Sequence, residues 1–115
     1  MKSPRVLILP AIAFLCAAWT QDKSPLELVQ TIPMEGVKSK IDHLAVDLAG
    51  KRLFVATTAN DSVQVIDLAQ GKVVHKIEGL AEPQGVVYLP DLKRLAVANG
   101  KDGSCRIFEI GRAHV

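Results

Sequence analysis

The sequence contains only two cysteines among its 115 residues, Cys16 and Cys105. Cys16 lies in an N-terminal segment that carries the features of a removable signal, so one thiol is expected in the folding part of the chain. A single thiol excludes the internal disulfide framework that stabilises many small exported domains. Cys105 lies in an apolar, strand-like run without a general base, and we expect it to be a small buried side chain.

The sequence also lacks the common motifs of covalent catalysis and cofactor binding. It has no nucleophile elbow, no glycine-rich phosphate loop and no cysteine pair for haem attachment. Its three histidines, His43, His75 and His114, have no partner at the spacing of a metal site. The sequence therefore predicts no catalytic residue, no cofactor and no metal site.

Residues 1–18 have the three parts of a secretory signal peptide. Lys2 and Arg5 make a positive start, Val6 to Leu15 is apolar, and small residues precede a cut after Ala18. The apolar part is too short for a stable membrane anchor and lacks the polar spacing of a buried core helix. Leu15 is too large for a lipoprotein signal, which disfavours lipidation of Cys16. We expect a cleaved signal-peptide helix, a periplasmic or extracellular protein without a stable membrane anchor, and a linker over residues 19–26.

The apparent net charge of +2 arises at the two ends of the chain. Lys2, Arg5 and Arg112 account for three of the 14 basic residues, and Glu109 for one of the 12 acidic residues. Eleven of each sign remain between them, so residues 19–108 are neutral. A neutral segment has no electrostatic footprint for nucleic acid, and we expect no nucleic-acid partner.

Residues 27–108 are predicted to be all-β. Short runs rich in Val, Leu and Ile recur every few residues and are interrupted by Gly, Pro, Asn and Asp, and no helical period is found. The expected strands are Glu27–Ile32, His43–Asp47, Arg52–Thr57, Ser62–Leu68, Lys72–Glu78, Gln84–Leu89, Lys93–Ala98 and Ser104–Phe108.

Part of this pattern occurs twice. Residues 43–66 align with residues 84–108 at an offset of 41, which becomes 42 if the turn at Pro90–Leu92 carries one extra residue. The identical pairs are Val46/Val87, Leu48/Leu89, Lys51/Lys93, Arg52/Arg94, Leu53/Leu95, Val55/Val97, Ala56/Ala98 and Ser62/Ser104. The run at 28–32 also resembles 73–77, the fourth strand of the repeat. A four-stranded period of 41–42 residues is typical of a β-propeller blade, whereas a β-sandwich explains the strands but not the period.

The string KRLFVATTANDSVQVIDLAQGKVV at 51–74 resembles the YVTN-type β-propeller repeat, and the segments IDHLAVD and EPQGVVY resemble the blade starts of exported YncE-like propeller proteins. The resemblance covers about residues 27–108. It implies a propeller fragment of roughly two four-stranded antiparallel blades. Glu109 stands where the first repeat has Asp67. Several propeller families share such repeats, so the resemblance concerns fold more than function.

The last seven residues, 109–115, need a separate explanation. The second repeat stops after its third strand, and Glu109 to Val115 can be back-translated into a common sequencing-adapter oligonucleotide followed by a stop codon. We therefore hypothesise an adapter-derived tail on a truncated gene; the alternative is a natural polar tail. Because such a fragment would leave two blade faces open, we expect it to aggregate or stay partly unfolded when expressed alone.

Four polar residues are candidates for a ligand-contacting face of the central channel: Asp42, His43, Glu82 and Gln84. His43 and Gln84 occupy equivalent positions at the start of the first strand of each repeat. The alternative is that all four hydrogen-bond the loops and shape the blade corner. The pairs Lys51-Arg52 and Lys93-Arg94 are interpreted as a solvated edge, because Asp47 and Asp91 stand near them.

Two functions agree with these observations. The first is a non-enzymatic binding scaffold for a protein or a small ligand, both unidentified. The second is a fragment of a lactonase-like or quinoprotein-like propeller enzyme with its active site in missing blades. Leu44, Ala45 and Val46 of the expected inner strand are not catalytic residue types, which favours the scaffold.

Overall fold

The structure is a computed structural model that describes residues 2–5 and 24–111 of the chain. The described part contains two antiparallel sheets and one turn of 3-10 helix, η1 (Thr58–Asn60). The first sheet has the order β1 (Leu44–Asp47), β2 (Arg52–Thr57), β3 (Ser62–Asp67) and β4 (Lys72–Ile77). The second has the order β5 (Pro83–Leu89), β6 (Arg94–Asn99) and β7 (Cys105–Glu109).

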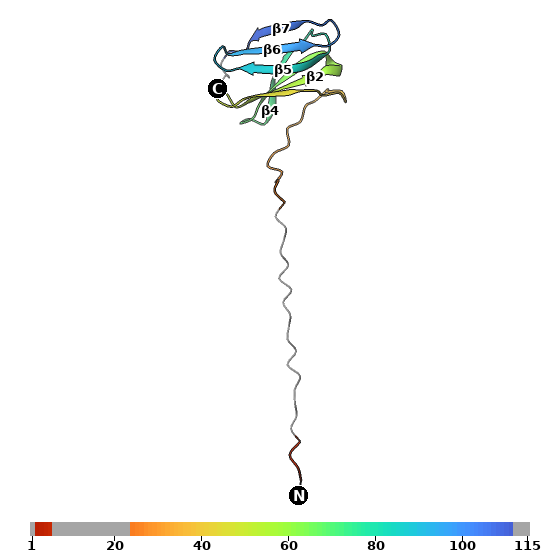
Figure 1. The fold of residues 1–115 in the computed structure, drawn as a ribbon, viewed down its shortest axis with the longest axis vertical. Coiled ribbons are helices and arrows are strands. Elements are labelled where there is room, and N and C mark those ends of the chain that lie inside the picture. The colour runs from red at the N-terminus through yellow and green to blue at the C-terminus, as the bar shows by residue number, and fades with distance from the viewer. Residues whose placement is uncertain (1, 6–23, 112–115) are drawn as a thin grey trace.

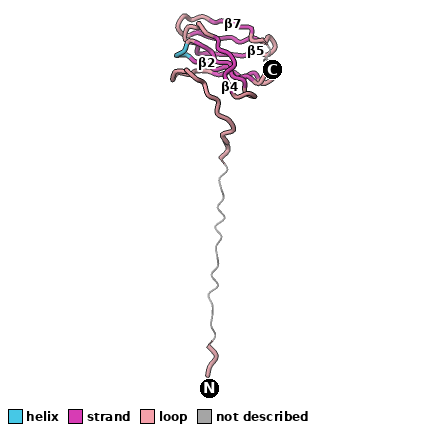
Figure 2. Tube along the Cα trace, turned by 180° about the vertical axis from the view of Figure 1, so that it is seen from behind, coloured by secondary structure: helices cyan, strands magenta, loops and turns pink. Residues whose placement is uncertain are grey.

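Both sheets are simple meanders, in which each strand pairs with its neighbour in the chain (Figure 1). The all-β prediction is therefore confirmed. Figure 2 shows how little of the described chain is helical. No helix among the described residues is long and apolar enough to cross a membrane. The predicted signal-peptide helix, its cut after Ala18 and most of the 19–26 linker fall on residues 6–23, outside the described part.

One predicted strand is absent. Residues 27–32 form no strand in the structure, and Leu28 and Val29 are 84% and 89% exposed. A strand forms only when its backbone groups find a partner strand, and no described strand pairs with this segment. The prediction was wrong because apolar composition indicates strand propensity but cannot supply the missing partner.

The two sheets have the same register at a constant offset of 42 residues. In the first sheet Asp47 pairs with Arg52, and in the second Leu89 pairs with Arg94. Both turns thus contain four residues, so the extra residue predicted at Pro90–Leu92 is not there. The same offset applies to the next two strands of each sheet. The facing pairs of β2 and β3, from Arg52 opposite Asp67 to Ala56 opposite Val63, each correspond to a facing pair of β6 and β7 that lies 42 residues later. Consequently the identities Val46/Val87 and Leu48/Leu89 do not join equivalent positions.

The hydrophobic core lies between the two sheets. Phe54, Val63, Leu95 and Val97 are all 0% exposed. The remaining buried members are Ala56, Val65, Ile77, Leu80 and Val86, and Ala45, Tyr88, Phe108 and Ile110 pack against them. β5 contacts both β1 and β2, which brings the first strands of the two sheets side by side.

The strands differ in burial as their composition suggests. β2 is buried along almost its whole length, whereas β4 exposes most of its side chains. Cys105 departs from expectation, because its side chain is exposed. It lies in β7, the last strand of its sheet, and a strand at a sheet edge has no further neighbour to cover it. Sequence polarity alone does not tell an edge strand from a central one.

The interpretation of Lys51-Arg52 as a solvated edge was wrong for Arg52, which is 5% exposed and forms a buried ion pair with Asp47. The Arg52 Nε and Nη2 atoms donate to Asp47 Oδ2 at 3.0 and 2.9 Å. Its guanidinium lies 5.5 Å from the centre of the Phe54 ring and 5.9 Å from that of Tyr88. Nη1 and Nη2 also donate to the carbonyls of Ile110 and Gly111 at 3.2 and 3.0 Å. One side chain therefore joins β1, β2, β5 and the end of the second sheet.

Replacement of Arg52 is expected to be strongly destabilising. Arg52→Ala leaves the Asp47 carboxylate buried without its cation, and loss of one partner of a buried pair typically costs about 3–5 kcal/mol. The matched control is Arg94→Ala, at the equivalent position of the second sheet, where the pair with Glu109 is exposed. That change should cost less than about 1 kcal/mol. Urea unfolding of both variants measures the difference, and equal losses would contradict the role of Arg52.

Acid is expected to weaken the same pair. Burial by itself raises the pKa of Asp47, but the Gly50 N–H bond and the bonds and charge of Arg52 outweigh it and hold the pKa below its usual value. A carboxyl group whose pKa is lowered by folding stabilises the folded state fully at pH values above its unfolded-state pKa of about 4. This stabilisation is lost as the pH falls through the lower pKa of the folded state. The free energy of unfolding should therefore decrease below about pH 4.

The variant Asp47→Asn isolates this contribution. The pKa of Asp102 is also lowered, by its hydrogen bonds to Ser104, so part of the acid dependence remains in the variant. The stability of Asp47→Asn should therefore fall less steeply with acid than that of the wild type. The free energy of unfolding of both proteins is measured in urea between pH 5 and pH 2.5. If it changes equally with pH in the wild type and in Asp47→Asn, Asp47 contributes nothing to the acid dependence.

Candidate functional site

Three of the four predicted site residues meet at the corner where the two sheets begin. The His43 backbone N–H donates to the Gln84 carbonyl at 3.1 Å, and the His43 ring atom Nδ1 lies 3.2 Å from the same oxygen. Nδ1 also lies 2.6 Å from Asp42 Oδ1. The His43 side chain is 72% exposed and that of Asp42 is 31% exposed. This polar corner, defined as Asp42, His43 and Gln84, therefore faces solvent.

An irregularity of the strands turns these residues toward one another. The Ala56 N–H of β2 donates to the His43 carbonyl, and the Ala56 carbonyl accepts from the Asp42 N–H, both at 3.0 Å. Asp42 and His43 therefore both stand opposite the single residue Ala56. In the second sheet the register shifts between Pro83 and Gly85, which leaves Gln84 as the extra residue. Such bulges redirect side chains at strand ends. With the offset of 42, Asp42 and not His43 is the equivalent of Gln84.

The loops on either side hold the corner in place. Asn60 accepts from the Lys38 N–H at 2.8 Å and donates to the Gly36 carbonyl at 2.9 Å, which fixes the segment that leads to Asp42. On the other side the Thr58 hydroxyl donates to the Pro83 carbonyl at 2.7 Å. Since Thr58 is buried, this bond ties η1 to the start of β5.

Glu82 has a different role from the other three residues. Its backbone is left-handed, with a φ of 52°. Its N–H donates to Asp61 Oδ1 at 3.0 Å, and its carbonyl accepts from the Gly100 N–H at 2.9 Å. Within the described residues no ion pair or hydrogen bond joins the Glu82 carboxylate to the polar corner. The backbone bonds of Glu82 shape the loop between β4 and β5.

The chemistry of the polar corner is that of hydrogen bonding. It offers an exposed imidazole held by a carboxylate and by the backbone carbonyl of Gln84, while the Gln84 side-chain amide lies against Gly100. No group of three or more His, Cys, Asp or Glu side chains that could hold a metal occurs in the described part of the chain. These groups suit recognition of a polar partner by hydrogen bonding.

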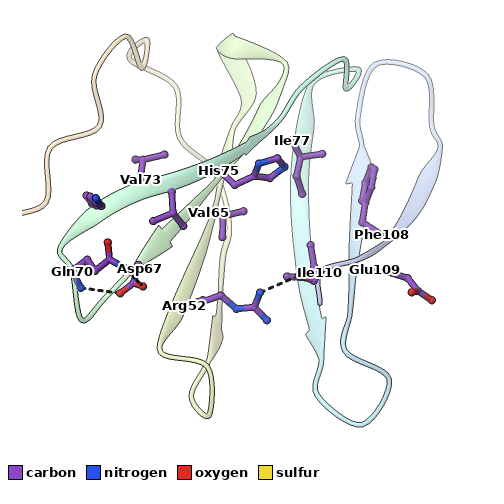
Figure 3. A pocket seen from close by; sticks show the side chains of 12 residues that line it. Arg52, Val65, Asp67, Gln70, Val73, His75, Ile77, Phe108, Glu109 and Ile110 are labelled. Carbon is purple, nitrogen blue, oxygen red and sulfur yellow. Dashed lines mark hydrogen bonds between the residues drawn. The ribbon is translucent and has the colours of Figure 1, made fainter. Parts of the chain in front are cut away.

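A groove of about 710 Å³ lies between β4 and the end of β7 (Figure 3). Val65, Ile77 and Phe108 line its apolar part. Arg52, Asp67, Gln70, Lys72, His75 and Glu109 make the rest polar. The sequence did not indicate this groove, because its walls come from strands that are distant in sequence and are brought together only when the sheets pack.

No protein-family model matches the chain, and no curated protein matches it significantly. The polar corner and the groove are therefore interpreted from their own residues.

Two glycines allow the polar corner and the ion pair to be perturbed separately. A Cβ at Gly100 would meet the amide end of Gln84, which can rotate away, whereas a Cβ at Gly50 would meet the Asp47 carboxylate that Arg52 holds. Gly100→Ala should change stability by no more than about 0.5 kcal/mol. Gly50→Ala should cost about 1–3 kcal/mol.

Urea unfolding measures both effects, and amide NMR shifts report where each change acts. Gly100→Ala should shift the signals of Gln84 and its neighbours while the unfolding midpoint stays near that of the wild type. A Gly50→Ala protein as stable as Gly100→Ala would show that Asp47 is not held rigidly.

Proposed function

We propose that this chain is an exported β-propeller repeat protein of the YVTN, YncE-like type that serves as a non-enzymatic binding scaffold. The observation that carries the proposal is the common register of the two sheets at an offset of 42 residues. Two meanders related by one period are expected when each is a blade of a propeller. In this interpretation β1–β4 is one blade and β5–β7 is most of the next.

The relative placement of the sheets supports the same interpretation. In a propeller the first strand of each blade lies nearest the central axis, and neighbouring blades contact there. β1 and β5 are the first strands of the two sheets, and they are in contact. The bond from the His43 N–H to the Gln84 carbonyl joins the starts of these two strands. The polar corner would then lie at one mouth of the channel, where its side chains reach a ligand.

The inner strands favour binding over catalysis. Asp47 is the single carboxylate in β1 and β5, and neither strand contains a histidine. Asp47 is occupied by Arg52 and by the Gly50 N–H. The carboxylate of these strands is thus engaged, and their other titratable side chain, Tyr88, packs against the core and the Phe54 ring. The partner is proposed to be a protein or a small polar ligand, and the compartment to be the periplasm or the cell exterior.

The proposal is tested by binding to the polar corner. The full chain, expressed in a bacterium and recovered from the exported fraction, is immobilised and incubated with periplasmic and culture extracts. We expect a protein or small molecule to be retained, and the double variant Asp42→Asn, His43→Ala to lose most of the retention. A loss of about 1.4 kcal/mol in binding free energy would reduce the affinity tenfold.

The control is His75→Ala, which changes an exposed histidine of β4 away from the corner. It should retain the partner like the wild type. Equal retention by the wild type and the double variant would refute the polar corner as the binding face. Absence of the chain from the exported fraction would refute the proposed compartment.

A further inference from the structure

We propose that the polar corner recognises a primary ammonium group, which donates a hydrogen bond to the Nε2 atom of a neutral His43. This specificity rests on the proposed function, because it states which chemistry the binding face of the scaffold accepts. Small amines and the lysine side chains of proteins both carry such a group, so each is a source of the same ligand chemistry.

The two contacts of the ring atom Nδ1 decide which nitrogen of His43 carries the hydrogen. Nδ1 lies 2.6 Å from Asp42 Oδ1 and 3.2 Å from the Gln84 carbonyl oxygen. An ionised carboxylate and a backbone carbonyl only accept hydrogen bonds, so both contacts are favourable only when Nδ1 is the donor. A neutral imidazole has a single ring hydrogen, and Nε2 is then left as an acceptor.

The backbone on both sides of the ring holds this acceptor in place. The His43 N–H donates to the Gln84 carbonyl at 3.1 Å, and the His43 carbonyl accepts from the Ala56 N–H at 3.0 Å. The Asp42 N–H donates to the Ala56 carbonyl at 3.0 Å. The His43 side chain is 72% exposed, and no described residue forms a hydrogen bond or ion pair with Nε2. Nε2 is therefore an accessible acceptor on a restrained backbone.

The polar corner offers acceptors rather than donors to a ligand. The hydrogen on Nδ1 is engaged by Asp42 and Gln84, and the Gln84 side-chain amide lies against Gly100. An anion placed at the corner would face the Asp42 carboxylate and the lone pair of Nε2, and both repel negative charge. A ligand group that binds Nε2 must therefore be a hydrogen-bond donor.

Asp42 gives the corner a negative charge that no cation cancels within the described residues. Its one ion-pair contact in this part of the chain is with His43, and a neutral ring brings no charge. Lys38 and Lys40 precede the corner and are exposed, but neither forms an ion pair with Asp42 there. A ligand that brings a donor and a positive charge is therefore favoured over an uncharged donor. A primary ammonium has three donors, one positive charge and no acceptor.

The position of the ring hydrogen is measured by magic-angle-spinning NMR on the nitrogen-15-labelled full chain, a method that does not require a monomer. At about pH 8 an ordinary histidine is neutral, and ring nitrogens with and without a hydrogen give well-separated signals. The hydrogen of His43 should lie on Nδ1. His75 is the control, because no described residue bonds to its ring, and it should show both forms. A hydrogen mainly on Nε2 of His43 would overturn the proposal.

Four small probes then test the ligand chemistry on the same sample. 1,4-Diaminobutane and the amide of Nα-acetyl-lysine both carry a primary ammonium, and both should move the Nε2 signal of His43. 1,4-Butanediol offers donors without charge on the same carbon chain, and it should move the signal less. Succinate, of the same length and opposite charge, should leave it unchanged. An equal shift with the diol, or a larger one with succinate, would show that the ligand group is not an ammonium.

Two variants separate the acceptor from the shape of the corner. His43→Asn keeps a donor near the position of Nδ1 and lacks an acceptor at the position of Nε2, so diaminobutane should no longer move the amide signals of Asp42 and Gln84. His43→Gln has a longer side chain whose oxygen can reach the position of Nε2, and it should keep part of the response. Both variants should unfold in urea near the midpoint of the wild type. A full response in His43→Asn would show that Nε2 is not the acceptor.

Chemical modification of the natural partner distinguishes this proposal from the proposed function. The extract used for retention is divided by dialysis into proteins and small molecules, and the primary amines of each fraction are either acetylated or dimethylated. Acetylation removes the charge and should abolish retention, whereas methylation keeps the charge and should preserve most of it. Retention that survives acetylation would refute the ammonium and leave the scaffold function intact. If neither fraction is retained while diaminobutane still moves the Nε2 signal, the scaffold function fails and the ammonium site stands.

Discussion

The Arg52 guanidinium is the contact on which the packing of the two sheets depends. Its charge is neutralised by Asp47, its faces lie near the rings of Phe54 and Tyr88, and its remaining donors bind the carbonyls of Ile110 and Gly111. A buried cation is tolerated only when both its charge and its hydrogen-bond donors are satisfied. Asp47 lies beside Arg52 in the first sheet, whereas Tyr88, Ile110 and Gly111 belong to the second or directly follow it, so all of these contacts form only when the sheets are correctly placed. Arg52 thereby couples the packing of the core to the position of the C-terminal end of β7.

The same demand for satisfied polar groups shapes the polar corner. Two bulged strand starts bring Asp42, His43 and Gln84 together, and the Gln84 carbonyl accepts from the His43 N–H and lies within hydrogen-bond distance of the His43 ring. The surrounding bonds from Thr58 and Asn60 hold the loops, so the exposed His43 ring stands on a rigid base. A rigid polar surface suits recognition, because little conformational entropy is lost when a partner binds. The proposed scaffold function follows from this combination of rigidity and exposure.

The groove and the edge of β7 differ from the polar corner, because there the packing of the two sheets leaves part of the surface uncovered. Among the described residues the first sheet has four strands and the second has three, so no strand of the second sheet covers β4. Free edges of this kind favour addition of a further strand, and folded proteins usually protect them. β7 carries the exposed Cys105 and Ile107 together with the exposed charged side chains of Arg106 and Glu109.

Local sequence was sufficient for the strands themselves. Alternating and continuous apolar runs, broken by turn residues, predicted seven of the described strands within one or two residues, since such patterns depend only on neighbouring side chains. The predicted site residues Asp42, His43 and Gln84 also meet, because each precedes or begins a first strand. Other features were decided by tertiary structure alone. The burial of Arg52, the exposure of Cys105, the failure of residues 27–32 to form a strand and the true offset of 42 all depend on which segments lie opposite one another. Pairing between distant segments is determined by packing of the whole domain, and a local pattern carries no information about which partners are present.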